Sequence, residues 1–350
     1  MKNILVTGGS GFIGSHTCLT LLKKGYNLTI IDSNINSSFK SIERIIQIGK
    51  IENLDFSKNI NLFHCDLGDQ KLLDKIFSTS LKNNLRISAV IHFAGLKAVH
   101  ESVINPIKYW ENNVNGSINL FKVMDRYDCK NIVFSSSATV YGNIENDLIS
   151  ENNNLCPTNP YGHTKLAIEN ILNDIFRSSK LKWRIAILRY FNPIGAHHSG
   201  LIGENPLAKP NNLFPYICNV AGGHLEKLSI YGNNWNTPDG TCIRDFIHIM
   251  DLADAHLAAL NYLLNNEGQI IHLNIGTGKG TSVLELVNLF MEVNNCALPI
   301  FFTNRRSGDV ARLVADNRLA LKKLNWKPKR DIQDMCKDGW NWQRKNPKGY

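Results

Sequence analysis

The stretch TGGSGFIG, Thr7 to Gly14, is the strongest indication of the fold in this sequence. It completes an apolar run, Asn3 to Thr7, with the composition of a buried strand, and it opens a segment of helical periodicity, Ile13 to Leu22. Glycines at such a junction permit a tight turn and let the backbone approach a pyrophosphate, which the free N–H groups of the helix start can bind. This order of strand, turn and helix predicts a dinucleotide-binding unit.

Short apolar runs alternate with amphipathic stretches through the first half of the chain. The strand-like runs are Asn3 to Thr7, Leu28 to Ile31, Asn61 to His64, Ala89 to Phe93, Asn131 to Ser135 and Arg184 to Arg189. Because parallel strands need crossover connections, this alternation predicts an α/β fold with a doubly wound parallel Rossmann sheet. We expect residues 1–190 to form this NAD-binding domain and residues 191–350 a smaller α/β substrate domain, with about 245–275 packing back on the sheet.

Composition places the chain among globular proteins, with 43% hydrophobic and 20% charged residues in 350. No apolar run reaches the ~18 residues of a membrane helix, and the N-terminal run is too short for a signal peptide. Eight cysteines without a CxxC pair suggest reduced thiols. We therefore expect a cytoplasmic protein without a membrane partner. His197 and His198 lack further ligands at metal spacing in the sequence, so no metal site is expected.

Basic residues exceed acidic ones by 39 − 30 = 9, mostly near the C-terminus. They are interleaved with Leu319, Leu321, Leu324 and Trp326 at helical spacing, which favours a solvated helix face over a nucleic-acid-binding tract. Attraction of an anionic small substrate is a second use for this charge.

Asp32 ends the second strand-like run, eighteen positions after Gly14. An acidic side chain there accepts hydrogen bonds from the adenosine ribose, and its charge repels a 2′-phosphate, so NAD is favoured over NADP. Asp66, after the third run, is a candidate adenine contact.

A second cluster of polar residues follows the fifth and precedes the sixth strand-like run. SSSATVYG occupies Ser135 to Gly142, and Tyr161 and Lys165 lie four residues apart on a segment that begins as a helix at Pro160. A lysine ammonium beside the phenol should lower its pKa from the usual ~10. Tyr161 is therefore a candidate general base.

Taken together, these motifs resemble the extended short-chain dehydrogenase/reductase superfamily and, within it, the UDP-glucose 4-epimerase family. Besides TGGSGFIG, the matching stretches are HFAGLKAV (His92 to Val99), ENNVNG (Glu111 to Gly116), SSSATVYG, NPYGHTK (Asn159 to Lys165), RYFNPIGAH (Arg189 to His197), PNNLFPYI (Pro210 to Ile217), RDFIHIMDLADAH (Arg244 to His256) and RRSGD (Arg305 to Asp309). The resemblance implies reversible C4 epimerisation of UDP-galactose and UDP-glucose through a 4-keto intermediate with tightly bound NAD. Tyr161 takes the C4 hydroxyl proton, assisted by Lys165, and Ser137 binds the same oxygen.

The resemblance also implies which residues bind the two ligands. The cofactor residues are Gly8, Gly11, Phe12, Ile13, Gly14, Asp32, Asn36, Ser37, Asp66, Leu67, Phe93, Ala94, Lys97, Asn112, Tyr161, Lys165 and Tyr190. The UDP-hexose residues are Asn192, Asn212, Leu213, Tyr231, Arg244, Arg306, Asp309 and Leu313. The arginines make independent sense, because guanidinium groups bind a diphosphate well.

Two other functions compete with epimerisation. A UDP-sugar dehydratase or decarboxylase is one, but related dehydratases carry an Asp-Glu pair where this chain has Ala138 and Thr139. A non-catalytic NAD-sensing regulator on the same fold is the other, and it would not need Ser137, Tyr161 and Lys165 together.

Two details of the resemblance bear on specificity and assembly. Leu313 stands where relatives often carry Tyr or Cys, at a position associated with room for a 2-acetamido group, which predicts some activity on N-acetylated UDP-hexosamines. Relatives are commonly homodimers that pair two helices per subunit, here Ile107 to Tyr127 and Tyr161 to Ser178. His100 and His163 stand where relatives have smaller residues, and we assign no function to either histidine.

Overall fold

The computed structural model of the chain describes all residues except 145–146, 180–181, 207–209, 211 and 307–308. Parts of the PNNLFPYI and RRSGD stretches therefore lie outside the described residues. Within the described part, no helix is both long enough and apolar enough to cross a membrane.

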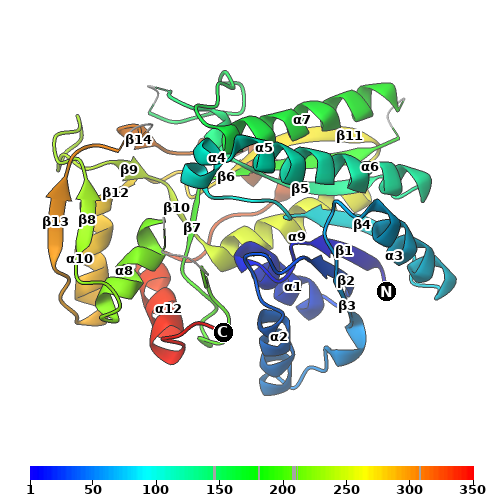
Figure 1. Cartoon of the computed structure of the whole chain (residues 1–350), viewed down its shortest axis with the longest axis horizontal. Coiled ribbons are helices and arrows are strands. Elements are labelled where there is room, and N and C mark those ends of the chain that lie inside the picture. Colours follow the sequence, from blue (N-terminus) through cyan, green and yellow to red (C-terminus); the bar gives the residue numbers. More distant parts are fainter. Residues whose placement is uncertain (145–146, 180–181, 207–209, 211, 307–308) are drawn as a thin grey trace.

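A parallel sheet of seven strands forms the centre of the molecule (Figure 1). Its order is β11-β6-β5-β4-β1-β2-β3, so the chain winds outward from β1 in both directions. The strands are β1 (Asn3–Thr7), β2 (Asn27–Asp32), β3 (Ile60–His64), β4 (Ile87–His92), β5 (Asn131–Ser137), β6 (Arg184–Tyr190) and β11 (Gln269–Ile275). The expected doubly wound Rossmann sheet is confirmed, and all six strand-like runs of the first half are strands.

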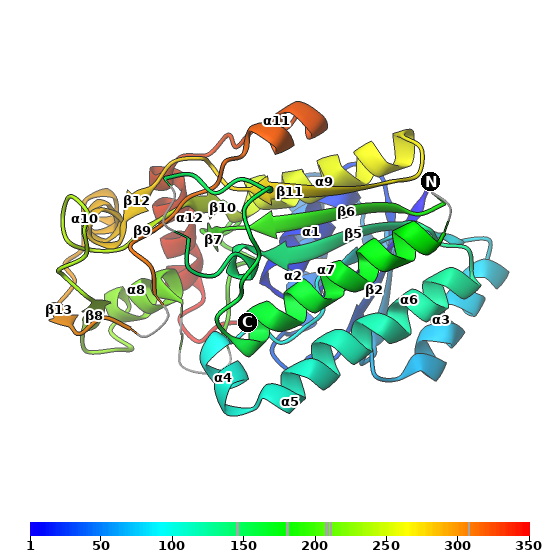
Figure 2. The same cartoon turned by 90° about the horizontal axis from the view of Figure 1, so that it is seen from above.

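Helices cover both faces of this sheet, because side chains of a strand point alternately to the two sides. In β1, Ile4 and Val6 enter one apolar cluster and Leu5 enters the other. The first cluster lies under α1 (Phe12–Lys23), α2 (Lys40–Ile51), α9 (Ile249–Asn265) and α11 (Arg318–Leu324). The second lies under α3 (Gln70–Lys82), α6 (Gly116–Arg126) and α7 (Pro160–Ser178). Figure 2 shows these two helical layers on opposite sides of the sheet.

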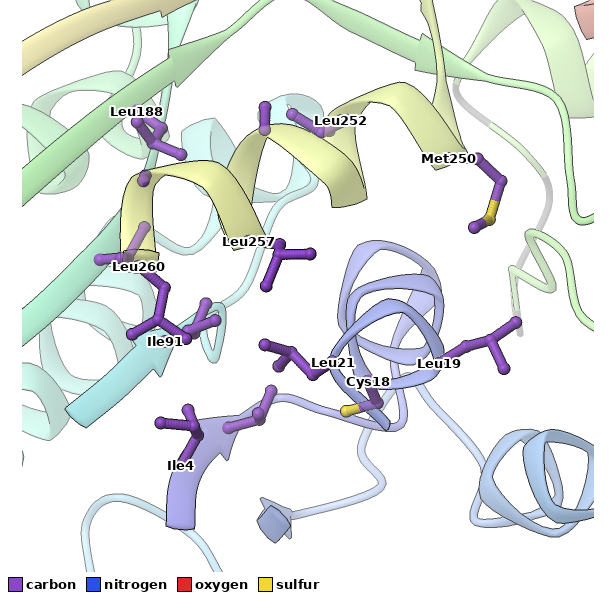
Figure 3. Packing of buried hydrophobic residues seen from close by; sticks show 14 of the residues in the cluster. Ile4, Cys18, Leu19, Leu21, Ile91, Leu188, Met250, Leu252, Leu257 and Leu260 are labelled. Carbon is purple, nitrogen blue, oxygen red and sulfur yellow. The ribbon is translucent and has the colours of Figure 1, made fainter. Parts of the chain in front are cut away.

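The second half of the chain contributes directly to the central sheet. β11 pairs in parallel with β6 along its whole length, from Gln269 opposite Arg184 to Ile275 opposite Tyr190. The preceding helix, α9, packs against α1 and the strands, and Figure 3 shows Leu257 of α9 facing Leu21 of α1 and Leu260 beside Ile91 of β4. Residues far apart in sequence thus close one core.

The remaining C-terminal elements form a smaller unit beside the carboxyl ends of the strands (Figure 1). Its strands are β7 (Asn192–Ile194), β8 (Leu228–Tyr231), β9 (Ile243–Arg244), β10 (Phe246–His248), β12 (Thr281–Ser282), β13 (Ile300–Thr303) and β14 (Arg312–Leu313). Its helices are α8 (Leu213–Ala221), α10 (Val283–Asn294) and α12 (Ile332–Lys345), which share a third apolar cluster. Short helical turns elsewhere are η1 (Ser57–Asn59) and η3 (Ala138–Val140).

A series of short helical segments, interrupted at Asn105, leads into α6. It consists of α4 (Val99–Ile104), α5 (Pro106–Tyr109) and η2 (Trp110–Asn115), the last being a π-helical turn. Such turns occur often at functional sites, because they redirect side chains within a helix. Here the turn carries Asn113, whose side-chain amide accepts from the Leu96 N–H (2.7 Å) and donates to Thr164 of α7 (3.1 Å). The loop after β4 is thereby fixed against α7.

Candidate active site

A single large cavity opens where the carboxyl ends of the strands meet the C-terminal unit. Its volume is about 1350 Å³. Pockets for one small ligand usually measure ~300–1,000 Å³. The cavity is therefore large enough for two ligands side by side.

Nearly all of the residues expected to bind cofactor or substrate line this cavity. Every expected cofactor residue is in its wall, and so are Asn192, Asn212, Tyr231, Arg244, Arg306, Asp309 and Leu313. Ser137 and Leu213 are not part of the wall. Leu213 is the first residue of α8 and packs against the apolar cluster of the C-terminal unit. The structure therefore does not bring its side chain to the cavity, because the helix turns that side chain toward the core.

The glycine-rich loop forms one end of the cavity and depends on two close backbone approaches. A Cβ at Gly14 would lie 2.2 Å from the Gly8 carbonyl oxygen, and one at Gly8, whose φ is +66°, would lie 2.8 Å from Ala94 N. Both distances are shorter than any van der Waals contact, so only glycine fits. The loop thereby places its backbone in the cavity wall at the start of α1, where the helix dipole favours an anion.

Asp32 is held firmly beside this loop. One carboxylate oxygen, Oδ2, accepts from the Ser10 N–H (2.9 Å), and Oδ1 accepts from the Asn34 N–H (2.9 Å) and the Ser37 hydroxyl (2.6 Å). A carboxylate offers about four acceptor positions, so one remains for a further donor.

Tyr161 and Lys165 enter the cavity from the first turns of α7. Pro160 occupies the first position of this helix, and Asn159 caps it by accepting from the Gly162 N–H (2.9 Å). The Lys165 ammonium donates to the Ser135 carbonyl oxygen (2.9 Å) and lies 5.9 Å from the centre of the Tyr161 ring. The helix thus places both side chains at the end of β5.

Burial, rather than the neighbouring lysine, governs the Tyr161 phenol. It raises the pKa of Tyr161 well above its usual value, the nearby Tyr190 adds to this, and the hydrogen bond with Ser137 opposes it. Burial also lowers the pKa of Lys165 to about 8, against the opposing charge of Glu169. The expectation that Lys165 lowers the pKa of Tyr161 is thus wrong for this structure, because the ammonium is turned toward Ser135. Ser137 acts from behind the cavity wall through its hydrogen bond with Tyr161.

Two arginines stand at the opposite end of the cavity. Arg244 forms an ion pair with Asp309 (3.5 Å) and also donates to the Val310 carbonyl oxygen (2.8 Å). The Arg306 guanidinium lies 4.7 Å from the centre of the Tyr231 ring. Guanidinium groups beside an exposed aromatic ring suit a ligand that carries phosphates and a flat base.

Comparison with known proteins supports one family. The GDP-mannose 4,6 dehydratase family matches residues 5–339. The UDP-glucose 4-epimerase of Bacillus subtilis is 48% identical over 99% of this chain and 98% of its own length. A bifunctional protein of Pachysolen tannophilus is 50% identical over the whole chain, which spans half the length of that relative.

A solved structure from the same family also matches the fold of this chain. The UDP-glucose 4-epimerase of Stenotrophomonas maltophila, crystallised with NAD and formylated UDP-arabinopyranose, is 42% identical, covers 99% of both chains and superposes with a TM-score of 0.93. The chain belongs to the UDP-glucose 4-epimerase family.

The residues at the end of β5 bear on whether the site could eliminate water from a sugar. Ala138 and Thr139 of η3 line the cavity there. Neither side chain has a carboxyl group, so neither position supplies the acid and base that elimination needs.

Sequence reasoning missed Glu204, which also lines the epimerase-family cavity. Its carboxylate pairs with the Lys97 ammonium at 2.9 Å and accepts weakly from the Asn212 side chain (3.4 Å). Desolvation lowers the pKa of the Lys97 ammonium, but the charge and hydrogen bond of Glu204 outweigh it and raise that pKa. Glu204 lies in a loop rich in Gly and Pro, 107 residues from Lys97, so no local pattern could have linked the two.

The structure places a third potential ligand beside His197 and His198. Glu52, which directly follows α2, has a carboxylate oxygen within 4.8 Å of a ring nitrogen of each histidine. Glu52 belongs to a distant segment, so spacing along the chain could not reveal this proximity.

Proposed function

We propose that this protein catalyses the reversible C4 epimerisation of UDP-galactose and UDP-glucose, with tightly bound NAD, in the cytoplasm. One observation carries the proposal: a single cavity joins the glycine-rich loop, the Tyr161 and Lys165 pair and the two arginines. Free thiols at all eight cysteines are typical of a reducing compartment. Residues 1–190 would then serve NAD and residues 191–350 the UDP-sugar.

The cofactor end of the cavity fits NAD. The backbone at Gly14 leaves no room for a side chain and is open to a pyrophosphate, and the remaining acceptor position of Asp32 suits a ribose hydroxyl. The Asp32 charge repels a 2′-phosphate. When bound, NAD supplies a hydride acceptor for C4 of the sugar, a hydride donor for the return step and, while oxidised, a positive charge.

Tyr161 is the proton carrier in the mechanism that we propose. Its phenolate oxygen takes the proton of the C4 hydroxyl as C4 loses hydride, and it returns that proton when the 4-keto sugar is reduced on its other face. The Ser137 hydrogen bond stabilises the phenolate against the effect of burial. Arg244 and Arg306 would hold the diphosphate while the 4-keto sugar turns about that linkage.

The experiment that tests this function is proton NMR of the anomeric region after mixing purified protein with UDP-galactose, without added NAD. Conversion to UDP-glucose is the expected result, since the cofactor is regenerated in each turnover. If the sugar stayed unchanged even after NAD was added, the non-catalytic regulator would become the better account.

Leu313 bears on whether the site accepts a sugar with a larger substituent. It lines the cavity and pairs in β14 with Arg244 of β9, and it packs against the apolar cluster around Tyr141. We expect measurable conversion of UDP-N-acetylgalactosamine and expect Leu313→Tyr to lower that rate ~10-fold or more, with little change on UDP-galactose. A parent rate on the N-acetylated sugar that equals background would contradict this.

The homodimer is a further part of the proposal. Val103, Ile104 and Ile107, on α4 and α5, are 60%, 63% and 67% exposed, beside α6 and α7. Exposed apolar groups of this kind mark association surfaces. We expect light scattering to give the mass of two chains for the parent and of one chain for Ile107→Asp. A monomeric parent would contradict the proposal, and Phe301→Asp, at an exposed residue of β13, serves as the control.

A further inference from the structure

A group of metal-ligating side chains lies outside the cavity and is not used by the proposed reaction. Glu52 directly follows α2, and His197 and His198 belong to the loop that follows β7. Their ligand atoms all lie within 4.8 Å of one another. None of the three residues lines the cavity.

We propose that Glu52, His197 and His198 bind one divalent transition-metal ion, for which zinc is the best match, with water completing the coordination. Two imidazoles and a carboxylate form a ligand set typical of zinc. In tetrahedral coordination, bonds of ~2.0–2.2 Å place two ligand atoms of one zinc ion about 3.4 Å apart, so ligand atoms that lie up to 4.8 Å apart must approach each other by at most about 1.4 Å.

The two histidines are already positioned by their loop. His197 is buried, and the His197 and His198 rings contact each other with their centres 4.2 Å apart and their planes tilted by 40°. The His197 carbonyl oxygen accepts from the Gly200 N–H (2.9 Å), and the His197 N–H donates to the Ile202 carbonyl oxygen (3.3 Å). These bonds close a tight loop, so little conformational freedom is lost when metal binds.

Ser199 orients the His197 ring. Its hydroxyl oxygen lies 2.8 Å from His197 Nδ1. In the tautomer with hydrogen on Nδ1, the ring donates to this oxygen and presents the Nε2 lone pair to a metal. Zinc would select that tautomer over the one in which Nδ1 accepts the Ser199 N–H (3.3 Å).

Two positively charged side chains lie near the proposed site, and a metal ion must displace any of them that is paired with a ligand residue. The Lys23 ammonium donates to Glu52 Oε1 (2.7 Å), and it is the direct competitor for this carboxylate. Its flexible side chain is 29% exposed and can swing into water. Arg330 also lies close to His197, but its charge is already paired with Asp251.

The test is equilibrium dialysis of the purified, cofactor-containing protein against Zn²⁺, in a Cys156→Ser background because Cys156 is exposed. We expect one zinc per chain, and ~10-fold or greater weakening in His198→Ala and in Glu52→Gln. Lys23→Gln should bind zinc more tightly, since its competing charge is gone. His224→Ala, which removes an exposed histidine elsewhere, should bind as the parent does.

The opposite results would overturn the proposal. These are no saturable zinc in the parent, parent-like affinity in both His198→Ala and Glu52→Gln, or loss of binding in His224→Ala. Substitution by Co²⁺ gives an independent readout, because oxygen and nitrogen ligands produce visible bands without a thiolate charge-transfer band. A strong thiolate band would place the metal on a cysteine and would also overturn the proposal.

Discussion

Tyr161→Phe is expected to lower kcat for UDP-galactose ~10²- to 10⁴-fold while NAD stays bound. The substitution removes only the phenolic oxygen, which is the proposed proton carrier, and leaves the ring in its place above the end of β5. The hydrogen bond with Ser137 is lost with that oxygen. Turnover followed by NMR, together with the absorbance of bound cofactor, separates lost catalysis from lost binding.

His163→Ala is the matched control for this variant. His163 lies two residues from Tyr161 on the same turn of α7, but its side chain is exposed. We expect its rate to stay close to that of the parent. If Tyr161→Phe kept more than about a tenth of the parent rate, the oxygen would not be the general base, since such a group contributes at least ~10²-fold.

Glu169→Gln is expected to lower the free energy of unfolding by about 3–5 kcal/mol. Glu169 of α7 and Arg189 of β6 form an ion pair (2.6 Å) whose side chains are 1% and 3% exposed. Removal of one charge leaves the other buried without its partner, and this desolvation cost is the physical reason for the large effect. Chemical denaturation of Glu169→Gln and the parent measures this difference.

The same substitution has a second readout at the active site. The Glu169 carboxylate raises the pKa of Lys165, which burial lowers to about 8. Without that carboxylate the pKa falls further, so Lys165 loses its proton at lower pH. The alkaline limb of the rate profile should move to lower pH in the variant.

Two further sets of variants test whether burial of the Glu169–Arg189 ion pair causes the expected loss of stability. Asp174→Asn breaks the exposed pair with Arg177 on the same helix and should cost nothing measurable. Glu169→Leu combined with Arg189→Met should cost clearly less than the sum of the single substitutions, because no unpaired charge remains. Additive costs in this cycle would contradict the explanation.

Local patterns predicted the elements that carry the site. The first six strands, the turn at Thr7 to Gly14 and the neighbouring positions of Tyr161 and Lys165 depend on apolar periodicity and on helix geometry over four residues. Such short-range features are visible in a sequence. The cavity position of the arginines came from the resemblance to a family, because an isolated arginine in a sequence is more often a surface charge.

Long-range packing decided what local patterns could not. The pairing of Glu204 with Lys97, and the approach of Glu52 to His197, depend on where distant loops meet. The direction in which the pKa of Tyr161 shifts depends on how completely its surroundings exclude water. Here burial raises that pKa, although a lysine lies one helical turn away. Local sequence thus predicted the first six strands, the glycine turn and the Tyr161 to Lys165 spacing, because these features arise within a few residues, whereas the order of the strands in the sheet depends on long-range pairing. The ion-pair partners and the pKa shifts of the site could be read only from the folded protein, because burial and contact are properties of the packed chain as a whole.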